Sequence, residues 1–158
     1  MHEVMLPHDI SLLQIPKGER MYGVVLPCSL SLNKDGVAIL RQREAREANQ
    51  RFKVGRKLGE YTLKYGEHVF YLGTYRNPSG GEFRLFSFPI KRKESEDCDA
   101  TMVSRSCQAL VNMCKRYGVG CCLVPDMDMD YQAFHNCIKP IYDLIFDNSF
   151  ILVHRKDK

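Results

Sequence analysis

Apolar and polar residues follow two periodicities along this chain, and together they predict an order of strands and helices. Short apolar runs next to Gly or Pro predict buried strands at 2–6, 21–26, 83–88, 121–124 and 150–153. Pro27 and Pro89 should end the second and third of these. Two further strands are expected at 60–64 and 68–75, around a Tyr65-Gly66 turn, and Asn77 to Gly81 forms the hairpin turn into 83–88.

Three segments have helical patterns. Residues 37–50 are rich in Arg, Glu and Ala, and Gly55 and Gly59 should bracket a turn after them. Residues 131–145 repeat apolar residues at helical steps, although Pro140 should kink this helix or mark its true start. Residues 100–117 carry one apolar stripe, which consists of Val103, Cys107, Leu110, Cys114 and Tyr117.

The order of these elements predicts the fold class. The chain ends in a β-α-β-α-β run, which favours an α/β protein with a mixed central sheet flanked by helices on both faces. With 158 residues the chain is long enough to bury a real core, so one domain over 1–158 is expected.

Composition and charge restrict the possible partners and compartment. The net charge of +4 permits an anionic ligand, but the basic residues are spread along the chain, so specific DNA or RNA binding is not expected. No apolar run approaches the roughly 20 residues of a membrane span and no signal peptide is seen, which predicts a cytoplasmic, reducing environment and no membrane partner.

The seven cysteines are expected to be free, reduced thiols, and several of them fall on predicted core faces: Cys107, Cys114, Cys121 and Cys122. A zinc site made of cysteines is disfavoured, because there is no C-x2-C pair and the adjacent Cys121 and Cys122 point to opposite faces of a strand. We therefore predict neither a metal nor a cofactor.

Two oppositely charged loops follow predicted strands. Lys91-Arg92-Lys93 comes after one strand, and the acidic loop from Asp126 to Asp130 comes after another. Because loops at the carboxyl ends of parallel strands share a crevice, we expect Lys91 to face this acidic loop across a ligand site. Alternatives stay open: Lys91 in a solvated turn, Asp130 as the cap of the next helix, and Mg²⁺ or Ca²⁺ held by alternate carboxylates.

Several motifs resemble those of macrodomains, the ADP-ribose-binding fold. Phe88-Pro89-Ile90-Lys91-Arg92 resembles the strand end F-P-T-K-R, Cys122-Leu123-Val124-Pro125 falls where that family has its L-P strand, and Pro7-His8-Asp9-Ile10 stands in place of G-D-I or G-D-L. The branch that is most similar includes terminal ADP-ribose protein glycohydrolase and antitoxins that remove ADP-ribose from DNA.

The resemblance implies roles for individual residues. It makes Lys91 the catalytic nucleophile that attacks the anomeric carbon, with Asp126 or Asp128 as its acid–base partner. Ligand contacts would come from Asp9 at the adenine, from Asn33 and Gly36 in the turn that opens the first helix, and from Asp130. The loop from Asp126 to Asp130 departs from the family's I-G-C-G-L-G, and its carboxylates would repel a diphosphate.

The function implied by this resemblance is binding of ADP-ribose or a related adenine nucleotide derivative, with removal of ADP-ribosyl groups from a macromolecule through Lys91 and a loop Asp. Phosphatase action on ADP-ribose 1''-phosphate is a variant of this activity. The alternative is a degenerate, non-catalytic macrodomain that acts as a binding, sequestering or protein-interaction module.

Overall fold

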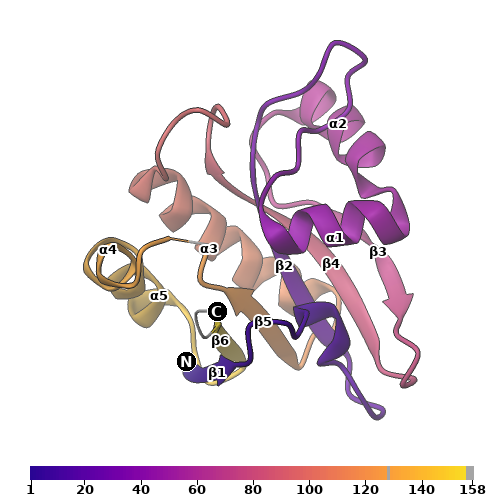
Figure 1. The fold of residues 1–158 in the computed structure, drawn as a ribbon, viewed down its shortest axis with the longest axis vertical. Helices are drawn as coiled ribbons and strands as arrows, with labels where there is room; N and C mark the ends of the chain where they lie inside the picture. Colours follow the sequence, from indigo (N-terminus) through magenta and orange to yellow (C-terminus); the bar gives the residue numbers. More distant parts are fainter. Residues whose placement is uncertain (128, 156–158) are drawn as a thin grey trace.

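A computed structural model describes residues 1–127 and 129–155 (Figure 1). Its six strands form one sheet in the order β1-β6-β5-β2-β4-β3, parallel throughout except for the antiparallel pair of β3 and β4. The elements are β1 (His2–Leu6), the 3-10 helix η1 (Leu12–Gln14), β2 (Tyr22–Ser29), α1 (Arg43–Phe52), α2 (Val54–Tyr65), β3 (Tyr71–Arg76), β4 (Glu82–Lys91), α3 (Ala100–Arg116), β5 (Cys121–Pro125), α4 (Tyr131–Cys137), α5 (Lys139–Ile145) and β6 (Phe150–Arg155).

The sheet carries a hydrophobic core on each face. Val25 of β2 points into the core shared with α3, α4 and α5, whereas its neighbour Val24 points into the core shared with η1, α1 and α2. This alternation is the period of two that a strand imposes on its side chains. The predicted α/β class, with helices on both faces of a mixed sheet, is confirmed.

Both predictions that a proline ends a strand are wrong. β2 runs through Pro27 to Ser29, and β4 runs through Pro89 to Lys91. Proline is tolerated in a strand where its missing N–H needs no partner. β5 stops pairing with β2 at Val24, and β3 stops pairing with β4 at Phe86, so both prolines lie beyond the end of one neighbouring strand. Lys91 is consequently the last residue of a strand.

The region from 37 to 66 differs most from the prediction. α1 begins at Arg43, where Gln42 caps it, and the expected turn and strand at 55–64 are instead the helix α2. Gly55 and Gly59 lie four residues apart on one side of α2, and because they have no side chain the segment around Gly36 can pack closely against the helix. A Cβ on Gly59 would lie 1.9 Å from the backbone oxygen of Gly36, so this contact requires glycine.

The remaining elements agree with the sequence pattern within a few residues. α3 covers the predicted stripe, β3 starts at Tyr71, and the segment around Pro140 is divided into α4 and α5, with Pro140 in the first turn of α5. All seven cysteines are free. In the described part of the chain, no helix has the length and apolar character needed to span a bilayer.

Candidate functional site

The loops that follow β2, β4 and β5 converge with the end of β6 at the carboxyl edge of the parallel strands, where open α/β sheets bind ligands. Three cavities lie along this edge. The first, of about 270 Å³, lies between the ends of β2 and β4, and the second, of about 580 Å³, lies between the end of β4 and α4. The third, of about 430 Å³, lies at the ends of β1, β5 and β6.

Lys91 lines the first and second cavities. Its Nζ donates a hydrogen bond to the backbone oxygen of Glu94 at 3.1 Å. The Glu94 carboxylate in turn accepts from the Ser29 hydroxyl at 2.6 Å, which ties the loop after β4 to the end of β2. Lys91 is therefore half-buried at a strand end, with its ammonium group beside two cavities.

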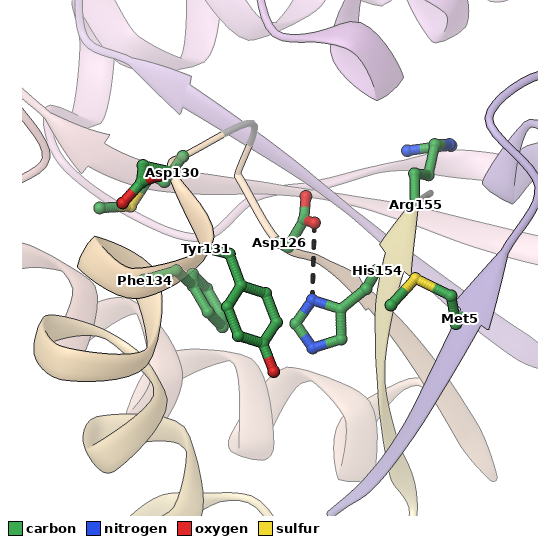
Figure 2. Close-up of a pocket in the computed structure, with 8 residues that line it drawn as sticks. Met5, Asp126, Asp130, Tyr131, Phe134, His154 and Arg155 are labelled. Carbon is green, nitrogen blue, oxygen red and sulfur yellow. Dashed lines mark ion pairs between the residues drawn. The ribbon is translucent and has the colours of Figure 1, made fainter. Parts of the chain in front are cut away.

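The acidic loop lies mainly along the third cavity. Asp126 and Asp130 line it together with Tyr131, Phe134, His154 and Arg155, as Figure 2 shows. Asp126 faces His154, with Oδ2 3.5 Å from Nδ1. Asp130 caps α4 by accepting from the Ala133 N–H at 3.1 Å, which agrees with the capping alternative. Asp128 lies outside the described residues.

The structure thus places Lys91 and the two described loop aspartates in neighbouring cavities. Met127 lines both Lys91 cavities, and Met129 lines the second and the third. Met127 is buried and has a φ of 68°, in the left-handed region that favours glycine. The loop therefore keeps one left-handed residue at a place where the resembled family has glycines.

The other residues predicted to bind ligand have local roles. The Asn33 side chain accepts from the N–H groups of Asp35 and Val37, at 2.8 and 3.0 Å, and Gly36 has a φ of 77° in the same turn. Asp9 lies exposed in the turn after β1. None of these three predicted residues lines a cavity at the described carboxyl edge.

Two residues that sequence reasoning missed lie at the end of β6. The side chain of Arg155 is only 9% exposed; it forms an ion pair with the fully buried Glu44 and donates from Nε to the backbone oxygen of Ile10 at 2.9 Å. Its Nη2 is buried without a hydrogen-bond partner in the described structure. The one signal in the sequence was position, since Arg155 follows the last apolar strand.

His154 is the second missed residue. Its Nδ1 faces Asp126, and its Nε2 lies 3.1 Å from Oε1 of Glu3. Hydrogen bonding to Asp126, supported by Glu3, raises the pKa of the His154 imidazole against the opposing effect of burial. Burial also raises the pKa of the Glu44 carboxyl, and the charge of Arg155 offsets only part of that effect.

Comparisons with known proteins identify the fold. No family model matches the chain, and no curated protein sequence does so either. Among solved structures, the macrodomain of Thermus aquaticus DarG is similar with a TM-score of 0.64 at 13% identity, over 98% of this chain and 99% of that one. A macrodomain protein from Streptomyces coelicolor gives a TM-score of 0.67 at 5% identity, over 99% and 100% of the two chains.

A third similar structure is a complex with a ligand. Thermosipho africanus DarTG in complex with ADP-ribose is similar over 96% of this chain and 44% of that one, with a TM-score of 0.59 at 11% identity. Because the sequence identities are only 5–13%, these similarities show the fold alone. The sheet order, the helices on both faces and these three comparisons show that this chain has the macrodomain fold.

Proposed function

We propose that the carboxyl edge of the sheet binds ADP-ribose or a related adenine nucleotide derivative. The observation that carries this proposal is the position of Lys91, a cation at a strand end that lines two of the three cavities. The similar DarTG structure contains ADP-ribose, which supports this class of ligand. The second and third cavities, of about 580 and 430 Å³, are also within the range of about 300–1,000 Å³ at which proteins bind small molecules.

The phosphate groups need hydrogen-bond donors, and two N–H groups of the described turn before α1 already have an acceptor. In the turn that opens toward α1, the N–H groups of Asp35 and Val37 already donate to Asn33. Two cationic side chains line the first cavity: Lys91, whose ammonium has three protons and gives one to Glu94, and Arg41, which is exposed. A diphosphate bound by these two groups would compensate for the repulsion from Asp126 and Asp130.

Hydrolysis of an ADP-ribosyl bond is the more specific form of the proposal. The Lys91 amine would attack the anomeric carbon, the bond from that carbon to the modified macromolecule would break, and a carboxylic acid would protonate the leaving group. Water would then release ADP-ribose and restore the amine. Asp126 or Asp128 would be the acid, and Asp126 would have to act from the neighbouring cavity.

A non-catalytic binding module is the second candidate, and a specific observation favours it. Asp126 faces His154, and Asp130 caps α4. Two of the three loop carboxylates thus have structural partners. Without one of these loop carboxylates as its acid, Lys91 would bind a phosphate as a point charge and leave the glycosidic bond intact.

Calorimetric titration with ADP-ribose and with AMP tests the binding proposal. The unmodified protein should bind ADP-ribose, and Lys91→Ala should weaken binding by about 1–2 kcal/mol, the scale of one charge-assisted hydrogen bond. Lys93→Ala is the matched control, because Lys93 is an exposed lysine in the same loop and should leave the affinity unchanged. Absence of heat with both nucleotides would overturn the proposal.

A single-turnover assay separates the enzyme from the binding module. If the protein is a hydrolase, it should release ADP-ribose from an ADP-ribosylated substrate, and Lys91→Ala should abolish release while most of the binding remains. Binding without release, in the unmodified protein, would favour the module.

A further inference from the structure

A cluster of three potential metal ligands lies beside the third cavity, which His154 lines. Glu3 comes from β1, His135 from α4 and His154 from β6, and one ligand atom of each lies within 4.8 Å of the other two. Oε1 of Glu3 is 3.1 Å from Nε2 of His154 and 4.0 Å from Nε2 of His135. Three elements that are far apart in the sequence thus bring the three side chains together.

Both imidazoles are oriented by a partner on their other nitrogen. Nδ1 of His135 lies 3.0 Å from the backbone oxygen of Tyr131, an oxygen that can only accept, so the proton is on Nδ1 and the lone pair is on Nε2. Nδ1 of His154 faces the carboxylate of Asp126, the contact drawn as a dashed line in Figure 2. Histidines that bind metals show this arrangement, in which a carbonyl or carboxylate holds the second ring nitrogen.

We propose that Glu3, His135 and His154 bind a divalent transition-metal ion of the zinc class, with a fourth coordination position open to water or a ligand. Two imidazole nitrogens and one carboxylate oxygen form the donor set of open zinc sites, whereas Mg²⁺ and Ca²⁺ prefer oxygen donors alone. The ion would replace the proton that His154 shares with Glu3.

The distances between the three ligand atoms require only a small movement of side chains when an ion binds. Metal–ligand bonds of about 2.0–2.1 Å place tetrahedral ligand atoms about 3.3 Å apart. The Glu3–His154 pair already fits, and His135, whose ligand atom is 4.0 Å from Oε1 of Glu3 and within 4.8 Å of that of His154, must move closer to both. Glu3 is 40% exposed and His135 is 24% exposed, so both side chains have room to move.

Lys139 is the group that opposes the ion. Its Nζ lies 3.9 Å from Oε2 of Glu3 and 2.8 Å from Oδ2 of Asp143. Since it approaches the second oxygen of Glu3 and forms its closer contact with Asp143, Oε1 remains available to a metal. His154 also lines the third cavity, so an ion held by the cluster would border that cavity.

Titration of chelator-treated protein with Zn²⁺ and with Co²⁺ tests the site. The unmodified protein should bind one equivalent of Zn²⁺, and its thermal unfolding midpoint should rise with the ion, because the ion joins β1 to α4 and β6. His135→Asn should weaken binding about tenfold or more and remove that rise. Asp126→Asn, which removes the carboxylate that faces Nδ1 of His154, should weaken binding about 10–100-fold.

His2→Asn is the matched control. His2 is exposed on β1 next to Glu3, and neighbouring residues of a strand point to opposite faces, so binding should be unchanged. His135 lies on α4 outside the buried core, so His135→Asn gives a result even if His154→Asn fails to fold. Co²⁺ bound by this cluster should lack the absorption band of thiolate-bound cobalt.

Three results would overturn the proposal. These are no stoichiometric binding of Zn²⁺ or Co²⁺, binding that is unchanged in His135→Asn, and a thiolate band, which would assign the ion to cysteines.

Discussion

The two ends of the carboxyl edge hold their cations in different ways. At the end of β6, Arg155 pairs with Glu44, which is 111 residues away in the sequence, and His154 lies between Glu3 and Asp126. At the end of β4, Lys91 donates to the backbone of Glu94, three residues further along the chain. The cations of the β6 end are held by contacts across the fold, whereas the Lys91 ammonium is held within its own loop.

This difference indicates which end of the edge stabilises the fold and which end can bind a ligand. A cation held by a buried carboxylate from another element cannot leave it without exposing two charges to a poorly solvated interior. A cation held by a backbone oxygen in its own loop can exchange that partner for a ligand at small cost. The β4 end is therefore suited to meet a ligand, while the β6 end keeps the fold together and positions its side chains in advance.

The largest expected effect is at the β6 end. Glu44→Ala should reduce the free energy of unfolding by about 3–5 kcal/mol, because it leaves the guanidinium of Arg155 buried and without its counterion. Urea denaturation measures this loss. Glu60→Ala is the control, since Glu60 is exposed on α2 and should change stability by about 0.5 kcal/mol or less.

A double variant then isolates the charge. Glu44→Met combined with Arg155→Met should recover most of the stability, since two apolar side chains of similar volume replace a buried pair. Failure to recover it would show that the hydrogen bond from Arg155 to Ile10, rather than the charge pair, stabilises this end.

The next largest expected effect is the loss of stability on substitution of Met127, which lies between the two ends. Met127 is buried and lines both Lys91 cavities, so Met127→Ala should cost about 2–3 kcal/mol of unfolding free energy and join these cavities. Met127→Gly removes the same side chain but relieves the left-handed backbone, and it should therefore be no less stable than Met127→Ala. A less stable glycine variant would contradict the assigned conformation.

A smaller effect reports on the charge of Lys91. Burial raises the pKa of the Cys98 thiol to about 11, and the nearby Lys91 partly counteracts this rise. Since the thiolate reacts with alkylating agents, Lys91→Ala should slow the alkylation of Cys98 severalfold. Exposed Cys137 is the internal reference in the same peptide map. An unchanged Cys98 rate would mean that the ammonium does not face this side of the crevice.

Local patterns were sufficient to predict much of the fold and the position of Lys91. The apolar runs gave the strands, and a lysine after such a run must lie near a strand end. The proline errors came from information that a single strand does not contain: Pro27 and Pro89 continue their strands because a neighbouring strand has already ended. Gly59 was misread for a similar reason, because its partner is the backbone of Gly36 in another segment.

The polar clusters at the β6 end could not be predicted from spacing. Glu3 and His154 are 151 residues apart, and each looks like an ordinary strand residue until β1 pairs with β6. Arg155 could not be predicted because its counterion, Glu44, lies on α1, which is far from β6 in the sequence. Contacts of this kind depend on topology, and the sequence reveals topology only coarsely.

The smallest expected effect is the stability change at the β4 end, and it tests the comparison most directly. Lys91→Ala removes one hydrogen bond to a backbone oxygen that water can reach, so it should cost less than about 1 kcal/mol of unfolding free energy. Lys93→Ala, in the same denaturation series, sets the baseline for an exposed lysine of this loop. A loss of 3 kcal/mol or more, on the scale of Glu44→Ala, would show that Lys91 is as much a part of the fold as Arg155. In that case a ligand would have to compete with the fold for the ammonium group, and the assignment of the β4 end as the ligand-binding end would fail.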